Sequence, residues 1–149
     1  GRVASSELGA QMTTLTRLPD WQQRFGDLVA QRMAMSFTWG QFDCVMWAAD
    51  AVQAITGHDF ADGMRGTYST ERQALRILKP LGGVAALADD RLPSRPLAMV
   101  RCGDVGLLDS DTRPTLVVYG GAHWLAATAN GLWGMPSERV SQAWSCEHA

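Results

Sequence analysis

Residues 43–57 read DCVMWAADAVQAITG, and this stretch decides the fold prediction. Its apolar side chains recur at helical spacing, so they cover one wide stripe of a helix. Asp43 precedes the stripe as the expected N-cap, and Gly57 is placed to end the helix in a left-handed conformation. The stretch therefore predicts a largely buried helix that begins at Cys44. The stripe comprises Cys44, Trp47, Ala48, Ala51, Val52 and Ile55.

Three further helical segments are expected in the N-terminal half of the chain. Pro19 suits the first turn of a helix that continues through Arg32. Thr70 together with Gln73 resembles a capping box, which predicts the start of a short helix. Residues 84–88 add one more turn. The first half of the chain is thus expected to be helical.

The second half has a different pattern. Beyond Pro96 the apolar residues recur with a period near two, which indicates strands. Gly120-Gly121 and Asn130-Gly131 are hairpin signals, the second because both central residues of a type I′ turn need a positive φ. Helices followed by an antiparallel meander predict an α+β domain. Strands are expected at residues 97–100, 105–108, 115–119, 123–128 and 132–135.

The length of 149 residues is typical of one domain. Apolar residues make up 46% of the chain and charged residues 19%, which is ample material for a packed core. Residues 1–11 are small and polar and lack periodicity, so we expect a flexible extension or a tag. Residues 12–149 are expected to form the single domain.

Composition also disfavours several classes of function. The net charge of -2, with scattered cations, lacks the footprint of a nucleic-acid binder. No apolar run approaches the roughly 20 residues of a membrane span, and no signal peptide is visible. Cys44, Cys102 and Cys146 are too widely spaced for a zinc motif or a disulfide framework, although one bridge stays open. We expect a reduced protein made in the cytoplasm, with no metal or cofactor.

Cys44 is the residue most suited to chemistry. In the first turn of a helix, free backbone N–H groups and the helix dipole favour negative charge. This position lowers the pKa of a thiol and favours a thiolate nucleophile. The alternative is a buried structural cysteine, because cysteine is among the most buried residue types. Spacing leaves both interpretations open.

A nucleophilic cysteine also needs a base, and the chain has three histidines. His148 lies at the C-terminus, and His58 is separated from Cys44 by roughly 20 Å of helix. His123, at the shoulder of the Gly120-Gly121 hairpin, is the remaining candidate. A two-residue turn pairs His123 with Val118, and a three-residue turn pairs it with Tyr119. The sequence does not choose between these registers.

With these residues in place, the chain resembles a known family. Residues 39–44 read WGQFDC, residues 56–59 read TGHD and residues 65–68 read RGTY. These motifs, followed by Gly103-Asp104-Val105 and a final Ala143-Trp144, resemble an uncharacterised family of small tailed-phage and prophage proteins. The proteins of that family are encoded among tail-tip genes and are related to the NlpC-type cell-wall endopeptidases. The resemblance covers most of residues 17–146.

The resemblance implies a papain-like fold in which the helix of Cys44 packs on an antiparallel sheet. It implies that Cys44 is the catalytic nucleophile, acting on peptide bonds of peptidoglycan without a metal or cofactor. The expected partners are other tail-tip proteins and peptidoglycan, with no nucleic acid and no membrane insertion. The expected location is the tail tip of the virion, after synthesis in the cytoplasm of the bacterial host.

The chain departs from these enzymes at one point. After the Gly-Asp turn they carry a Gly-His pair that supplies the base, whereas residues 113–119 here read RPTLVVY. Two hypotheses follow. In the first, the protein is a cysteine peptidase or amidase that aids cell-wall penetration, with Cys44 as nucleophile and His123 as substitute base. In the second, it is a catalytically inactive structural or docking module of the tail tip.

Overall fold

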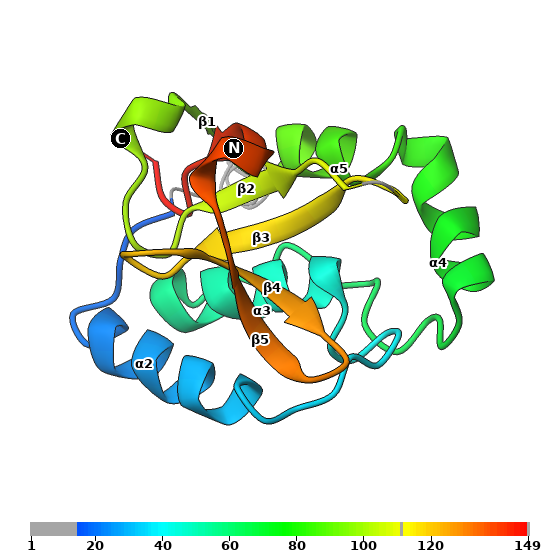
Figure 1. The fold of residues 1–149 in the computed structure, drawn as a ribbon, viewed down its shortest axis with the longest axis horizontal. Helices are drawn as coiled ribbons and strands as arrows, with labels where there is room; N and C mark the ends of the chain where they lie inside the picture. Colours follow the sequence, from blue (N-terminus) through cyan, green and yellow to red (C-terminus); the bar gives the residue numbers. More distant parts are fainter. Residues whose placement is uncertain (1–14, 111, 149) are drawn as a thin grey trace, which may run out of the picture.

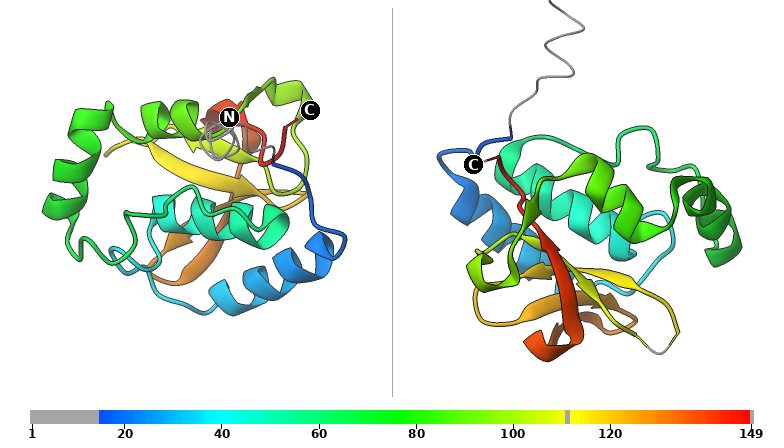
Figure 2. Two further views of the ribbon diagram at one scale, coloured as in Figure 1. Left: turned by 180° about the vertical axis from the view of Figure 1, so that it is seen from behind. Right: turned by 90° about the horizontal axis from the view of Figure 1, so that it is seen from above.

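The computed structural model describes residues 15–110 and 112–148, in which four α-helices gather on one side of a six-stranded antiparallel sheet (Figures 1 and 2). This arrangement confirms the α+β class. The helices are α2 (Trp21–Arg32), α3 (Cys44–Thr56), α4 (Glu71–Leu78) and α5 (Val84–Arg91). Single 3₁₀ turns form η1 (Lys79–Leu81), η2 (Leu97–Met99) and η3 (Ser137–Arg139).

The sheet has the strand order β1-β6-β2-β3-β4-β5. Strands β2 to β5 form the expected meander, and β6 returns to pair with β2 and β1. The strands are β1 (Ser94–Arg95), β2 (Val105–Leu108), β3 (Thr115–Tyr119), β4 (Trp124–Thr128), β5 (Gly131–Met135) and β6 (Val140–Trp144). The sheet twists strongly, so that β4 and β5 cross the direction of β2 and β3 (Figure 1).

Helix α3 is the centre of the packing. It crosses the face of β3 (Figure 1), and Trp47 and Ile55 are both fully buried. Its N-cap is Asp43, whose side chain accepts a hydrogen bond from the N–H of Met46, and Gly57 ends it with a φ of 81°. Both predicted ends of this helix are therefore confirmed. The opposite face of the sheet is covered by a second apolar cluster around Trp124.

Several predicted elements need correction. Helix α2 begins at Trp21 rather than in the turn of Pro19. The strand predicted at residues 97–100 is the 3₁₀ turn η2, which follows Pro96 and lacks a strand partner in the described chain. Strands β1 and β6 were not predicted. Polar residues interrupt the alternating pattern of both, and only their pairing with each other and with β2 makes them strands.

Both hairpins form, but with other turns than expected. Tyr119 pairs with Trp124, and the N–H of Gly120 bonds to the carbonyl of His123 at 2.8 Å, so neither predicted register of His123 occurs. In the second hairpin, Gly131 alone has a positive φ, of 94°, and it already pairs with Thr128. The turn before it is therefore not type I′, which requires a positive φ at two residues.

Helix α4 stands at the edge of the molecule, away from the sheet (Figures 1 and 2). Thr70 caps it by accepting the N–H of Gln73 at 3.2 Å, as predicted. Ala74 is its one buried residue, so its remaining apolar side chains are left partly open. This exposed wall contributes to the site described below.

The expected extension at residues 1–11 lies outside the described residues. No helix in the described part of the chain has the length and hydrophobicity that crossing a membrane requires.

Candidate functional site

Cys44 is the first residue of α3, as predicted, and its side chain is partly buried. The preceding residue, Asp43, fixes this helix start. Its Oδ1 accepts the N–H of Met46 at 2.9 Å, and its Oδ2 accepts the N–H of Gly40 at 2.8 Å. The hydroxyl of Tyr68 donates a third bond to Oδ2, at 2.6 Å. Because these bonds engage both oxygens of a carboxylate that is only 1% exposed, Asp43 is structural rather than a free base.

Gly40 and Tyr68 are also held together through their backbones. Gly40 has a φ of 83°, and a Cβ at this position would lie 2.0 Å from the carbonyl oxygen of Tyr68. Only glycine tolerates both the backbone conformation and the approach. The WGQFDC and RGTY motifs are therefore two halves of one packed unit around the start of α3.

Arg65 ties the RGTY motif to the side of α3. Its Nε and Nη2 bind the carboxylate of Asp59 at 2.7 and 3.1 Å, and its Nη2 lies 2.7 Å from Asp50. Asp50 also pairs with Arg32 of α2 at 3.0 Å. Burial alone would raise the pKa of Asp59, but the hydrogen bonds from Arg65 and Ala61 outweigh burial and hold that pKa below its usual value. The motif thus has a structural role.

The thiol of Cys44 faces the beginning of β3. Burial is the largest influence on it and raises the pKa of the thiol to about 11, although the backbone N–H groups of Leu116 and Val45 act in the opposite direction. The negative charge of Asp43 raises the pKa further, and Arg113 lowers it. The position at a helix start therefore does not yield a thiolate at neutral pH, contrary to the sequence-based argument.

The N–H of Leu116 is free to face the thiol because β3 and β4 diverge. The two strands pair at Val118 with Leu125 and at Tyr119 with Trp124, and this pairing does not continue along the described strands toward Leu116. The N–H of Tyr119 donates to the carbonyl of Asp104, the residue before β2, at 2.8 Å. Because N–H groups alternate between the two sides of a strand, the N–H of Leu116 points to the opposite side, which β4 has left.

Cys44 opens into a pocket of about 420 Å³ between the start of α3, the segment 113–114 before β3, and the wall formed by α4, η1 and the start of α5. Most of its surface is apolar. Its charged residues are Asp43, Lys79 and Arg113. Trp39, Val45, Leu75, Leu78, Val84 and Pro114 are among the apolar residues that line it.

None of the three histidines lines this pocket. His123 is exposed in the β3–β4 turn, opposite Gly120. Gly120 lies four residues along the strand from Leu116, or about 13 Å. His58 is exposed just beyond α3. His148 instead pairs with Leu15, whose N–H donates to its Nδ1 at 2.7 Å. The structure thus does not bring Cys44 and His123 together, and the role of His123 as a base stays a prediction.

A family model described as a domain of unknown function (DUF6950) matches residues 16–146. The chain belongs to this family. No curated protein matches it. The matched residues span the start of α3 with both of its supporting motifs, as well as the whole sheet.

The Gly103-Asp104 motif of this DUF6950 domain is structural as well. Asp104 is fully buried and accepts the N–H groups of Arg101 and Cys146 at 2.8 and 3.2 Å. Its Oδ2 lies 2.9 Å from Nε of Arg95. Burial raises the pKa of Asp104 despite these partners. This cluster of charged side chains lies at the beginning of β2, and through Cys146 it anchors the C-terminal segment there.

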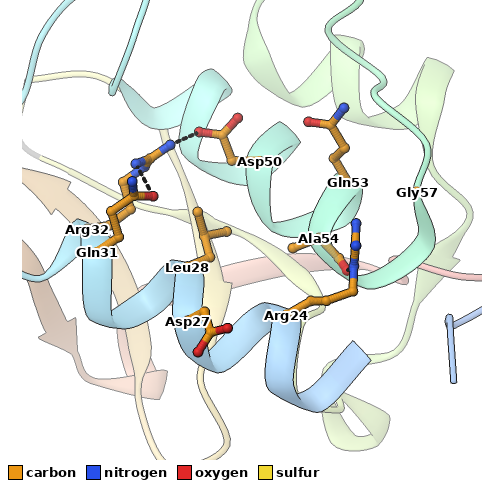
Figure 3. A pocket seen from close by; sticks show the side chains of 9 residues that line it. All are labelled: Arg24, Asp27, Leu28, Gln31, Arg32, Asp50, Gln53, Ala54 and Gly57. Carbon is orange, nitrogen blue, oxygen red and sulfur yellow. Dashed lines mark hydrogen bonds and ion pairs between the residues drawn. The ribbon is translucent and has the colours of Figure 1, made fainter. Parts of the chain in front are cut away.

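The DUF6950 domain has a second, larger concavity between α2 and α3 (Figure 3). Figure 3 shows Arg32 reaching across from α2 to Asp50, while Arg24 lies beside Ala54, whose carbonyl accepts its Nε at 2.6 Å. This groove is polar and shares no residue with the Cys44 pocket. Arg32 bonds to Gln31 and Asp50, and Arg24 bonds to the backbone of Ala54, so both arginines of the groove are used to join α2 to α3 or to a neighbouring side chain.

Sequence reasoning missed three parts of the pocket: Arg113, Lys79 and the α4 wall. Arg113 stacks on the ring of Trp39, with its Cζ 4.9 Å from the ring centroid, and pairs with Glu71 at the start of α4. The leucines of α4 were a possible signal for this wall. A helix whose apolar side chains stay exposed can border a partner protein or a pocket. In residues 15–110 and 112–148, no group of three or more His, Cys, Asp or Glu is arranged to hold a metal ion.

Proposed function

We propose that this DUF6950 domain is a component of a phage tail tip that has an NlpC-like, papain-like fold and uses its Cys44 pocket for binding rather than hydrolysis. The fold proposal is supported by a cysteine at the start of a buried helix that packs on an antiparallel sheet. The tail-tip assignment rests on the resemblance of the WGQFDC and RGTY motifs.

One observation carries the preference for binding: among the residues that the structure describes, none is placed to act as a base for the thiol. No histidine lines the pocket, and the hydrogen bonds of Asp43 engage both of its oxygens. With a pKa of about 11, the thiol stays protonated at neutral pH. Loss of a general base typically costs about 10²–10⁴-fold in rate. The residues of the pocket are therefore better suited to holding a ligand than to cleaving one.

The second candidate is a cysteine peptidase or amidase that acts on peptidoglycan and aids cell-wall penetration. It is favoured by the thiol itself, which opens into a pocket and lies beside the N–H groups of Val45 and Leu116. Such donors stabilise developing negative charge during acyl transfer. This activity requires His123, or another base, to reach the thiol from elsewhere.

Peptidoglycan fragments incubated with the wild type, Cys44→Ala and His123→Ala distinguish the two candidates. Mass spectrometry of the products is expected to show equal inactivity of all three. Cleavage by the wild type that is lost in Cys44→Ala contradicts the binding proposal. The tail-tip assignment has its own test, because the protein should be recovered with purified virions and cross-link to neighbouring tail proteins. Absence from virions contradicts that assignment.

A further inference from the structure

Residues 69–82, which comprise α4, η1 and the residues that flank them, are weakly anchored to the rest of the molecule. Ala74 is the one buried residue of this segment. Ile77 and Leu78 pack against the core but are only partly buried. A segment with few buried apolar contacts opens at a lower free energy than the core around it. Residues 69–82 are therefore the part of the pocket wall that moves most easily.

The residues on either side of this segment are firmly placed, and a glycine pair lies at one end. Tyr68, just before the segment, is 7% exposed and donates its hydroxyl to Asp43. Leu87, in the first turn of α5, is 1% exposed. Between η1 and α5 lie Gly82 and Gly83, with φ angles of 95° and 97°. Glycine accepts large backbone changes at little steric cost, so this pair is suited to act as a hinge.

One ion pair ties the segment to a distant part of the chain. Arg113 donates a hydrogen bond to the carboxylate of Glu71, at the start of α4. Within the described part of the chain, the other hydrogen bonds of residues 69–82 stay inside the segment or reach the adjoining Gly83. The side chains of Glu71 and Arg113 are 50% and 38% exposed, so water and salt weaken their attraction.

This ion pair crosses the opening of the Cys44 pocket. Arg113 belongs to the segment before β3, and its Cζ lies 4.9 Å from the ring centroid of Trp39, which also lines the pocket. Glu71 belongs to α4, which with η1 forms the wall on the other side. The pair therefore holds the two walls together, and its loss allows them to separate.

We propose that residues 69–82 form a hinged lid over the Cys44 pocket, with the Glu71–Arg113 ion pair as its latch and Gly82-Gly83 as its hinge. Release of the latch lets the lid turn outward and opens the path to the thiol for larger molecules. The inference rests on the proposed function for the role of the pocket as the working site, whereas the lid itself is defined by access to the thiol.

Alkylation of Cys44 by two reagents of different size measures the opening of the lid. Iodoacetamide is small, and tetramethylrhodamine iodoacetamide carries a large rigid ring system on the same reactive group. In both reactions the thiolate displaces iodide, so a change in the ionisation of Cys44 alters both rates equally and leaves their ratio unchanged. In the full chain, Glu71→Gln should raise the ratio of the large-reagent rate to the small-reagent rate about two- to fivefold, as expected for an exposed ion pair. An unchanged ratio overturns the latch.

Two controls separate lid opening from a general loosening of the fold. Peptide mass spectrometry gives the same ratio for Cys102, which lies outside the pocket and should not respond to Glu71→Gln. Asp90→Asn removes the exposed ion pair of Asp90 with Arg91, which does not border the pocket, and should leave the ratio at Cys44 unchanged. An equal rise at Cys102, or in Asp90→Asn, overturns the lid.

Salt tests the latch without a change at the hinge. Raising the salt concentration from roughly 0.05 to 0.5 M screens attraction between exposed charges. The ratio at Cys44 should therefore rise with salt in the wild type and stay constant in Glu71→Gln, which has already lost the pair. The same salt response in both proteins contradicts the latch.

Gly83→Ala and Gly63→Ala test the hinge. Both glycines have a positive φ, of 97° and 90°, and neither has an atom within 4 Å of an added Cβ. In Gly83→Ala the backbone strain falls on the closed lid, so opening relieves it and the ratio at Cys44 should rise. Gly63 lies outside residues 69–82, so Gly63→Ala should leave the ratio unchanged. The same ratio in both variants overturns the hinge.

The peptidoglycan assay keeps this inference distinct from the proposed function. Cleavage that depends on Cys44 refutes the proposed function, whatever the alkylation ratio does. A ratio that is unchanged by Glu71→Gln, in a protein that is inactive toward peptidoglycan, refutes the lid alone.

Discussion

The hydroxyl of Tyr68 donates a 2.6 Å hydrogen bond to Oδ2 of Asp43, the N-cap of the helix that carries Cys44. The two residues belong to separate motifs, 25 positions apart. This bond holds the carboxylate of Asp43 in place, and that carboxylate caps the first turn of α3. The loop that ends at Tyr68 therefore helps to position the helix start. The geometry of the thiol therefore depends on a tertiary contact as well as on the local cap.

Tyr68→Phe removes this bond and leaves a buried carboxylate with one donor fewer. We expect a loss of about 1–3 kcal/mol in the free energy of unfolding, measured by urea denaturation at pH 7. Burial and the contact with Asp43 raise the pKa of Tyr68, so the folded protein holds this proton more tightly than the unfolded chain. That contribution is complete below about pH 10 and is lost as the pH rises further. The free energy of unfolding of the variant should accordingly fall less steeply above pH 10 than that of the wild type. The same slope in both proteins contradicts a stabilising role for the Tyr68 proton.

Gly40→Ala should be the more damaging change at the same contact. The added Cβ meets the carbonyl oxygen of Tyr68, and the φ of 83° is strained for alanine. A loss of about 3 kcal/mol or more is expected in thermal or urea unfolding. Gly63→Ala is the control, since Gly63 has a φ of 90° with no atom within 4 Å of the added Cβ. Its cost should be about 1–2 kcal/mol, from the backbone alone. Equal losses of unfolding free energy in the two variants would exclude the contact between the added Cβ at position 40 and the carbonyl of Tyr68 as the cause.

Arg65→Met tests the anchor of the RGTY motif. It removes the hydrogen bonds to Asp59 and the pairing with Asp50, with an expected loss of about 1–3 kcal/mol at pH 7. The pKa of Asp59 is lowered in the folded protein, so its stabilisation is present above the unfolded pKa of about 3.9 and is lost as the pH falls through the folded value. The wild type should therefore lose stability below about pH 4 more steeply than the variant. Parallel acid profiles contradict this role for Arg65.

Much of the fold is predictable where the pattern is local. The stripe after Asp43 and the cap at Gly57 predict α3 with both of its ends, and the apolar pattern with a period near two predicts β2 and β3. Strand β6 is not predicted because Ser141 and Gln142 interrupt its apolar pattern. Its place between β1 and β2 also depends on pairing with segments far away in the sequence. The turn at Asn130 is misassigned because Gly131, already part of β5, carries the positive φ by itself.

The site is predictable only as far as its helix start. Asp43 and Cys44 follow from the cap and the stripe, but the pKa of the thiol depends on burial against β3, which no local pattern encodes. Arg113 and Lys79 come from a loop and a helix end that the fold brings to one pocket. The exposed position of His123 follows from a hairpin register that the two glycines leave undetermined.

The claim that the Cys44 pocket binds rather than cleaves is tested most directly by the ionisation of its thiol. The measurement is the rate of iodoacetamide alkylation at Cys44 as a function of pH, followed by peptide mass spectrometry so that Cys102 and Cys146 are counted separately. We predict slow modification at pH 7 and a rate that rises to a midpoint near pH 11. A midpoint below pH 7 indicates an activated thiolate and contradicts the account.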